Sequence, residues 1–191
     1  MIGELSLEEH FKVWAPEQCI VNIRSIIEEV VKIKPKIYLE IGAAGLGTFR
    51  IFESLLPPSP QGLAIGVDNT ISENAIERWK NYKSVSGCDV CLIQGDSASE
   101  VVKKEVIEKL AGRKVDYLLI DGLHTYEHVK SDWEDYAPLV RSGGIVTFHD
   151  YNVNTKETEN VGKLVHELID KGYRAYLPPY SNISSMMVYI Q

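Results

Sequence analysis

The segment DYLLIDGLHTYEHVKSDWEDYAPLVRSGGIVTFHD, residues 116–150, determines the fold that the sequence predicts. It contains two apolar runs, YLLI and IVTF, separated by an amphipathic helical pattern. Two buried strands joined by one helix form a βαβ unit with parallel strands, whose carboxyl ends meet at one edge of the sheet. Ligands of open α/β sheets bind at that edge. The polar residues that follow the two runs are therefore expected to converge on one site: Asp121, His124, His149 and Asp150.

The rest of the chain repeats this alternation of strand and helix. Strands are predicted at residues 37–41, 63–67, 90–94, 117–120, 145–148, 173–177 and 185–190. A helix is expected after each of the first five strands, and a further helix from 16 to about 34 precedes them. Ser97 can cap the helix after the third strand, which is expected to end at about Leu110. The last two strands are joined by a turn that is too short for a crossover helix, so we expect them to pair as an antiparallel hairpin.

These elements define an α/β fold. We expect a Rossmann-like three-layer α/β/α sandwich around a seven-stranded, mostly parallel sheet with a C-terminal antiparallel hairpin strand. A chain of 191 residues suits a single domain, 1–191, in which residues 1–34 add an N-terminal helical cap.

The composition is that of a globular protein, with 45% hydrophobic and 25% charged residues and a formal net charge of −7. No apolar run approaches the about 20 residues of a membrane span, and the first residues lack the apolar core of a secretory signal. A cytoplasmic protein without a membrane partner is therefore expected, and the negative charge argues against nucleic acid as a partner. Cys88 and Cys91 lack a second pair of metal ligands and are expected to pack as small apolar residues.

The first turn of the predicted sheet, residues 40–48, has the sequence EIGAAGLGT. Its three glycines allow a ligand to approach the backbone, but their spacing is G-x-x-G-x-G and not the G-x-G-x-x-G of dinucleotide-binding folds. Glu40 would repel a pyrophosphate, whereas it suits a ligand with an ammonium or sulfonium charge. Asp68, which ends the second strand, can accept hydrogen bonds from two ribose hydroxyls, and Asp96 can accept one from an adenine amino group.

With these residues the chain resembles the class I S-adenosylmethionine-dependent methyltransferases. The D-G-x-H-x-Y-E segment that begins at Asp121 is similar to that of the macrolide sugar O-methyltransferases and the cephalosporin hydroxylase-like proteins. The resemblance implies an S-adenosylmethionine site formed by Glu40, Gly42, Ala43, Gly45, Asp68, Asp96, Ser97 and Asp121. It also implies a divalent metal, usually magnesium, held by Asp121, His149 and Asp150. Because the branch often has an acidic residue where His149 stands, the imidazole shifts the metal preference toward manganese, iron or zinc.

The expected activity is a metal-assisted O-methyl transfer to a hydroxyl of a small molecule, with sugars among the candidates. A metal at Asp121 and Asp150 would lower the pKa of the acceptor hydroxyl, and a neutral imidazole would take its proton. His124 is the expected general base, because it follows Asp121 by three residues and its reference pKa of about 6.5 leaves it mostly neutral near pH 7. His149 is its competitor for this role.

Other interpretations stay open at this stage. The glycines could be turn formers, the strand-end carboxylates could cap helices, and His149 could support a metal ligand without binding the metal itself. The protein could hold the cofactor without catalysis, or catalyse another reaction on the same fold, since fold alone does not fix function. An NAD-dependent oxidoreductase is a weaker third hypothesis. The acceptor and the oligomeric state, including a homo-oligomer, are left open.

Overall fold

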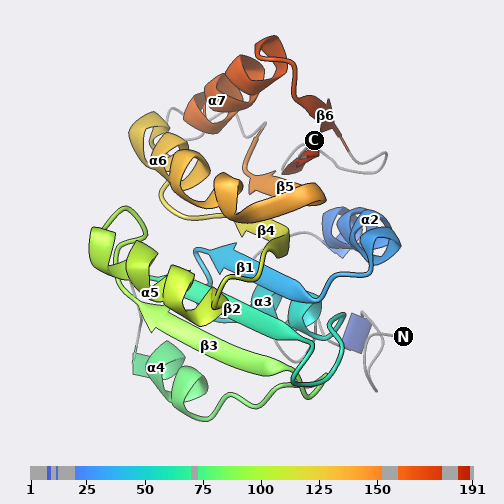
Figure 1. Ribbon diagram of the computed structural model, residues 1–191, viewed down its shortest axis with the longest axis vertical. Coiled ribbons are helices and arrows are strands. Elements are labelled where there is room, and N and C mark those ends of the chain that lie inside the picture. The colour runs from blue at the N-terminus through green and yellow to red at the C-terminus, as the bar shows by residue number, and fades with distance from the viewer. Residues whose placement is uncertain are drawn as a thin grey trace.

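The computed structural model describes residues 8, 9, 12, 20–69, 73–151, 159–177 and 185–189. Within them one sheet has the strand order β3-β2-β1-β4-β5-β7-β6 (Figure 1). The strands are β1 Ile37–Ile41, β2 Leu63–Asp68, β3 Asp89–Gln94, β4 Val115–Ile120, β5 Val140–His149, β6 Arg174–Tyr176 and β7 Ser185–Tyr189. The helices are α2 Ile20–Val30, α3 Gly47–Glu53, α4 Glu73–Lys80, α5 Glu100–Leu110, α6 Tyr126–Tyr136 and α7 Glu159–Asp170, with 3-10 turns at Val31–Ile33 and Ala137–Leu139.

The Rossmann-like α/β fold with a parallel sheet is confirmed. Five strands, from β3 at one edge to β5, run parallel to their neighbours. The C-terminal strand β7 runs antiparallel to β5 and to β6. The strand order reverses between β1 and β4, and in open α/β sheets the crevice at such a reversal is where ligands bind.

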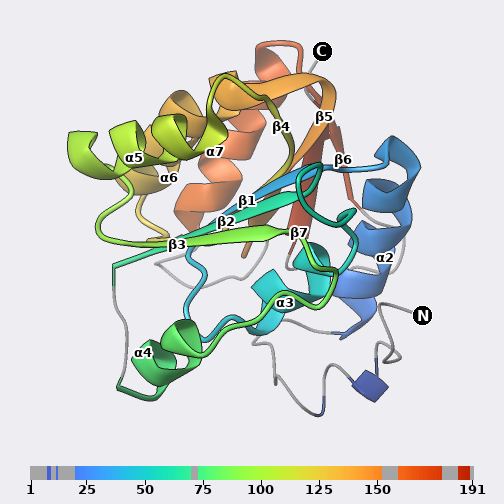
Figure 2. The ribbon, with the colours of Figure 1, turned by 60° about the horizontal axis from the view of Figure 1, so that its bottom comes forward.

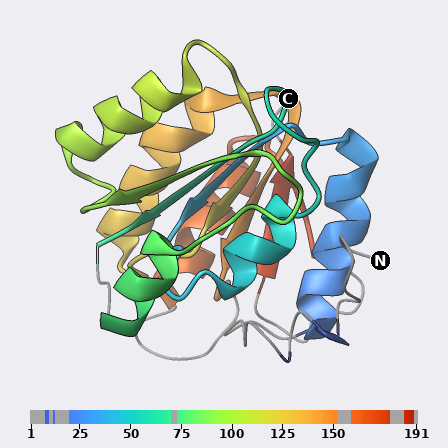
Figure 3. The same cartoon turned by 90° about the horizontal axis from the view of Figure 1, so that it is seen from below.

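Helices cover both faces of the sheet. Helices α5, α6 and α7 lie on one face, and α2, α3 and α4 lie on the other (Figures 2 and 3). Successive residues of a strand point to opposite faces, so each strand contributes to two hydrophobic clusters. In β1, Leu39 and Ile41 join the cluster under α5–α7, whereas Tyr38 joins the cluster under α2 and α3.

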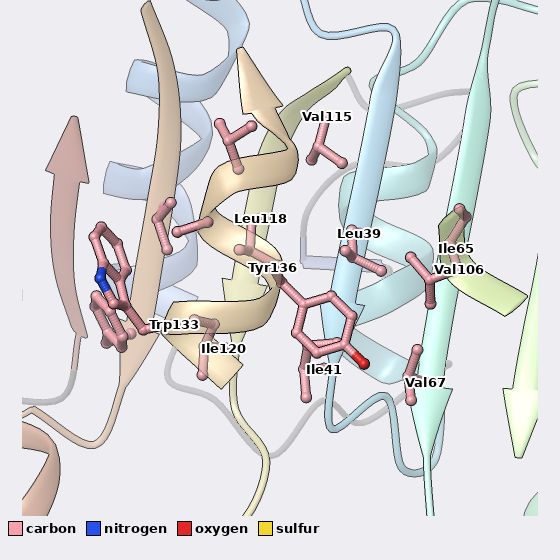
Figure 4. Close-up of a cluster of buried hydrophobic side chains, with 14 of the residues drawn as sticks. Leu39, Ile41, Ile65, Val67, Val106, Val115, Leu118, Ile120, Trp133 and Tyr136 are labelled. Carbon is pink, nitrogen blue, oxygen red and sulfur yellow. The ribbon is translucent and has the colours of Figure 1, made fainter. Parts of the chain in front are cut away.

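Helix α6 is fixed to the sheet by aromatic side chains. Trp133 is 8% exposed and Tyr136 is fully buried. Figure 4 shows both side chains in one buried cluster with strand residues such as Ile41 of β1 and Ile120 of β4. The position of α6 relative to the ends of the strands is therefore set by the core, and polar residues on the same helix can be placed accurately beside the site.

Two details of the elements differ from what the sequence indicated. Strand β5 begins at Val140, five residues before its predicted start, and its register with β4 shifts so that Val115 pairs with Val140 and Tyr117 with Ile145. Helix α5 is capped by Ser99, whose side chain accepts a hydrogen bond from Val102 N. Ser97, the cap that the sequence indicated, instead lines a cavity at the carboxyl ends of the parallel strands.

Some predictions fall on residues outside the described part of the chain. These are the first turns of the N-terminal helical cap before Ile20, apart from three helical residues at 8, 9 and 12, and the turn between β6 and β7. Among the described helices, none combines the length and apolar character that crossing a membrane requires.

Candidate active site

A cavity of about 600 Å³ lies at the carboxyl ends of the parallel strands. All residues that the sequence assigned to the cofactor or the metal line this cavity, as does His124: Glu40, Gly42, Ala43, Gly45, Asp68, Asp96, Ser97, Asp121, His124, His149 and Asp150. The fold therefore brings together side chains from segments more than a hundred residues apart.

The turn after β1 passes very close to the end of β4. Gly42 has a φ of +90°, and a Cβ on this residue would lie 2.0 Å from the backbone oxygen of Asp121. Only glycine fits at this position. Ala44 N donates a hydrogen bond of 2.7 Å to Asp68 Oδ2, and Trp79 Nε1 of α4 donates one of 3.1 Å to Ala44 O. One of the two Asp68 oxygens that were expected to bind ribose thus also holds the turn.

Glu40 is a buried acid next to this turn. It is 1% exposed, and the hydroxyl of Tyr38 donates a hydrogen bond of 2.5 Å to its Oε2. Burial raises the pKa of Glu40 well above its ordinary value; the Tyr38 hydrogen bond opposes this, while the charges of Asp121 and Asp68 raise it further. Glu40 therefore favours its neutral form here. A ligand with a positive charge would favour the carboxylate instead.

Two carboxylates and two imidazoles meet at the ends of β4 and β5. Asp121 Oδ1 lies 3.5 Å from His124 Nε2 and 3.1 Å from His149 Nδ1. Asp150 Oδ2 lies 3.3 Å from each of the same two nitrogen atoms. Each imidazole therefore faces both carboxylates, and the convergence that the sequence predicted is present.

The carboxylates favour the charged form of both imidazoles. Burial lowers the pKa of His149, but hydrogen bonds with Asp121 and Asp150 raise it to about 10. A hydrogen bond with Asp121 raises the pKa of His124, burial partly opposes this, and the charge of Asp150 raises it again. This direction is opposite to the neutral His124 expected from its reference pKa. The sequence spacing did not show that two carboxylates would face the same ring.

The cluster has the donor atoms of a divalent metal site. Asp121, His124 and Asp150 each offer one ligand atom, and these atoms all lie within 4.8 Å of one another. The set expected from the sequence contained His149 in place of His124. Since His149 Nδ1 lies within 3.3 Å of the same two carboxylates, either imidazole can complete the set. Oxygen and imidazole ligands together suit magnesium, manganese, iron or zinc.

The end of β3 forms the opposite side of the cavity. Asp96 is exposed, and its Oδ1 accepts a hydrogen bond of 2.9 Å from Ala98 N. The neighbouring Ser97 is held through its backbone, because the hydroxyl of Tyr136 donates a hydrogen bond of 2.7 Å to Ser97 O. The backbone of this segment at the adenine end is thus fixed by α6, while Ala98 N holds the Asp96 side chain.

The structure adds lining residues that the sequence did not single out: Thr48, Asn69, Arg78, Leu123 and His128. His128 lies in the first turn of α6, four residues after His124, so its closeness to His124 in the chain could have pointed to it. Arg78 could not have been found in this way, because its approach to the turn after β1 depends on how α4 packs. Its Nη1 lies 3.5 Å from Gly45 O.

The strand order, the antiparallel strand β7 and the cavity at the strand ends together define the class I methyltransferase fold. Residues 39–151, more than half of the chain, match a family model described as a methyltransferase domain, and the chain belongs to that family.

Solved structures with the same fold include several methyltransferases. The MycE methyltransferase of the mycinamycin biosynthetic pathway, solved with Mg, S-adenosylhomocysteine (SAH) and mycinamycin VI, superposes with a TM-score of 0.67 at 17% identity, over 98% of this chain and 55% of MycE. A putative caffeoyl-CoA O-methyltransferase from Staphylococcus aureus has a TM-score of 0.67 at 20% identity, over 97% of this chain and 93% of that one. CalS11, a TDP-rhamnose 3'-O-methyltransferase of calicheamicin biosynthesis, has a TM-score of 0.64 at 16% identity, over 88% of this chain and 77% of CalS11.

A sequence relative is more limited in extent. The uncharacterized protein y4gI of Sinorhizobium fredii is 37% identical over 49 residues, which are 26% of this chain and 5% of y4gI. The chain thus spans about half the length of MycE and a small part of y4gI.

Proposed function

We propose that the protein is an S-adenosylmethionine-dependent, metal-assisted O-methyltransferase that acts on a hydroxyl of a small molecule. One observation carries this proposal. At the wall of one cavity, the carboxylate oxygens of Asp121 and Asp150 lie within 3.5 Å of the imidazole nitrogens of His124 and His149. The methyltransferase domain family and the O-methyltransferases among its structural neighbours support the same chemistry.

Different lining residues of the cavity would bind the different parts of S-adenosylmethionine. The cofactor supplies an activated methyl group on a sulfonium centre. Glu40 and the turn at Gly42 would face its methionine end, where the carboxylate of the buried Glu40 would attract a positively charged group. Asp68 would accept hydrogen bonds from the ribose, and Asp96 and Ser97 would bind the adenine.

Asp121 and Asp150 would hold the divalent metal, with one imidazole beside them. When bound there, the metal lowers the pKa of an acceptor hydroxyl and offsets the negative charge that favours protonated imidazoles. The MycE structure contains Mg together with SAH, which supports a metal in this branch of the fold.

His124 is the proposed general base, and its exposure supports this assignment over His149. The His124 side chain is 31% exposed and lines the cavity, so it can reach an acceptor, whereas the His149 side chain is 13% exposed and lies deeper against both carboxylates. His149 is then the imidazole that ligates the metal or positions its ligands. If His124 ligates the metal instead, the two roles are exchanged.

Methyl transfer from labelled S-adenosylmethionine tests the function, with sugars, glycosides and phenols as acceptors and Mg²⁺ or Mn²⁺ present. Label should appear in one class of hydroxyl compound and should disappear on chelation. With that acceptor, His124→Ala should lower turnover by about 10²–10⁴ and leave the affinity for SAH unchanged, while the exposed His166→Ala serves as the control.

Three outcomes would contradict parts of this proposal. SAH binding without label transfer to any acceptor would favour the alternative of a non-catalytic cofactor-binding protein. Methyl transfer that continues after chelation would show that the reaction does not need a metal. A His124→Ala enzyme with near-normal turnover would assign the base to His149 or to solvent.

A further inference from the structure

Tyr38 is a buried tyrosine that is hydrogen-bonded to Glu40 of the cavity lining. The two residues are two apart in β1, so their side chains lie on the same face of the sheet. Tyr38 is fully buried, and its hydroxyl donates a hydrogen bond of 2.5 Å to Glu40 Oε2. Glu40 lines the cavity, and Tyr38 contacts it from the hydrophobic cluster under α2 and α3.

The ring of Tyr38 is held by three aromatic neighbours. It stacks on the ring of Tyr117 in β4, with 5.1 Å between the ring centroids and 9° between the ring planes. The rings of Phe49 and Phe52 in α3 lie beside it, with their centroids 5.7 and 5.6 Å away. Aromatic contacts of this kind fix both the position and the tilt of a ring. The hydroxyl of Tyr38 is therefore a preorganised donor, already in place before any ligand binds.

This hydrogen bond affects both the direction and the charge of the Glu40 carboxylate. A glutamate side chain has several rotatable bonds, and a rigid donor on Oε2 restricts them. Burial favours the neutral acid, whereas the hydrogen bond from Tyr38 favours the carboxylate. An ionised carboxylate can accept about four hydrogen bonds, so the bond to Oε2 leaves Oε1 for a ligand. A carboxylate that is both oriented and ionised is the form that attracts an ammonium group.

We propose that Tyr38 is a positioning residue that holds the Glu40 carboxylate toward the ammonium group of the cofactor's amino acid chain. The inference rests on the proposed function, in which Glu40 faces the methionine end. Without the Tyr38 hydroxyl, Glu40 can turn away and its burial favours the neutral acid, so the ammonium group loses a well-placed partner. The nucleoside end of the cofactor is unaffected, because its proposed partners follow β2 and β3.

Calorimetric titration with SAH and with 5'-methylthioadenosine tests this inference. The second ligand has the same nucleoside and thioether sulfur but lacks the amino acid chain. The wild-type protein should bind SAH at least about tenfold more tightly than 5'-methylthioadenosine. Tyr38→Phe keeps the ring and its packing but removes the hydroxyl. Its affinity for SAH should fall by at least about fivefold, while its affinity for 5'-methylthioadenosine should stay within about twofold of the wild type.

Two further variants test whether Tyr38 acts through Glu40. Tyr117→Phe removes a hydroxyl from the ring stacked on Tyr38, and the Tyr117 hydroxyl makes no hydrogen bond with Glu40. This matched control should keep the wild-type preference for SAH. In a Glu40→Gln background the charge that Tyr38 orients is already absent, so adding Tyr38→Phe should change the preference by less than about twofold.

The outcomes separate this inference from the proposed function. A wild-type protein that does not bind SAH would overturn both. If the wild type binds SAH and the preference of Tyr38→Phe falls by less than about fivefold, the inference alone is overturned. Equal weakening of both ligands would show a merely structural role for Tyr38 and would also overturn it. The same applies if Tyr117→Phe loses the preference to the same extent, or if the effect of Tyr38→Phe persists in the Glu40→Gln background.

Discussion

Asp150 has a backbone conformation that few residues adopt. Its φ of 55° lies in the left-handed region, which aspartate tolerates better than most residues other than glycine. This turn directly after β5 brings the carboxylate to within 3.3 Å of both His124 and His149. Strained positions of this kind occur preferentially at binding sites, so the conformation supports a functional use of Asp150.

Replacing Asp150 by Asn should weaken metal binding. The substitution keeps the shape of the side chain but removes one of the two negative charges that face each other at this site. We expect the affinity for Mn²⁺ to fall by at least about tenfold in a calorimetric titration. Asp170→Asn, at the exposed end of α7, is the matched control and should bind as the wild type does. Equal affinity in all three proteins would show that the pair of carboxylates is structural.

A second prediction at the scale of single residues concerns how Asp132 makes the stability of the protein depend on pH. Burial raises the pKa of Asp132 to about 6, and Ser97 and His128 only partly oppose the shift. The folded state therefore binds this proton more tightly than the unfolded state, whose aspartate pKa is about 3.9. The stabilisation is fully present below the unfolded pKa and is lost as the pH rises through about 6.

Asp132→Asn removes this pH dependence. The difference in unfolding free energy between variant and wild type should shift by about 2 kcal/mol in favour of the variant from pH 4.5 to pH 7.5. Urea denaturation at both pH values measures it, and the other titrating groups cancel in the difference. Parallel stability curves for the two proteins would show that Asp132 is not shifted.

At the scale of elements, Glu53 joins helix α3 to the segment before β3. It is fully buried and accepts hydrogen bonds from Ser84 Oγ, Ser86 Oγ, Val85 N and Tyr82 OH, among others. Burial alone would raise the pKa of Glu53, but the hydrogen bonds lower it below the ordinary value. Its stabilisation is therefore present at neutral pH and is lost as the pH falls through the folded-state pKa.

Glu53→Ala should destabilise the protein strongly. It leaves buried donors without an acceptor, which places it among the large effects of single substitutions, about 3 kcal/mol or more. Chemical denaturation at pH 7.5 measures the loss, and Glu108→Ala on the exposed side of α5 is the control, with a change within about 0.5 kcal/mol. A loss of unfolding free energy below about 1 kcal/mol for Glu53→Ala would contradict the proposed role of Glu53 in joining α3 to the segment before β3.

The sequence predicted the elements well where its periodicity was strong. Strands β2, β4 and β5 were found because their apolar runs stop at polar residues, and the positions of the site residues followed from parallel topology. The cap of α5 could not be assigned in the same way. Ser97 and Ser99 are both acceptable N-cap residues, and only tertiary structure shows that Ser97 faces the cavity.

Side-chain contacts between different helices, strands and turns could not be predicted from the sequence. Trp79 and Arg78 of α4 reach the turn after β1 because of how α4 packs, and no spacing along the chain encodes that approach. The raised pKa of His124 is a similar case. It results from Asp121 and Asp150 together, which follow the ends of two different strands, β4 and β5.

At the scale of the whole molecule, the reversal of strand order between β1 and β4 places the cavity. The lining includes five carboxyl groups, Glu40, Asp68, Asp96, Asp121 and Asp150, against one guanidinium from Arg78 among the described residues. A protein with a formal net charge of −7 and such a cavity favours ligands that carry positive charge. A sulfonium cofactor and a divalent metal both meet this requirement, whereas a dinucleotide with its pyrophosphate does not.

Calorimetric titration with SAH, with NAD as the comparison ligand, tests the central claim most directly. We predict a dissociation constant in the micromolar range, equivalent to about −8 kcal/mol. Asp68→Ala should weaken binding by about 1.5–3 kcal/mol, because hydrogen bonds to a charged acceptor are lost. The absence of binding heat at millimolar SAH, or tighter binding of NAD than of SAH, would contradict the assignment of this cavity to S-adenosylmethionine.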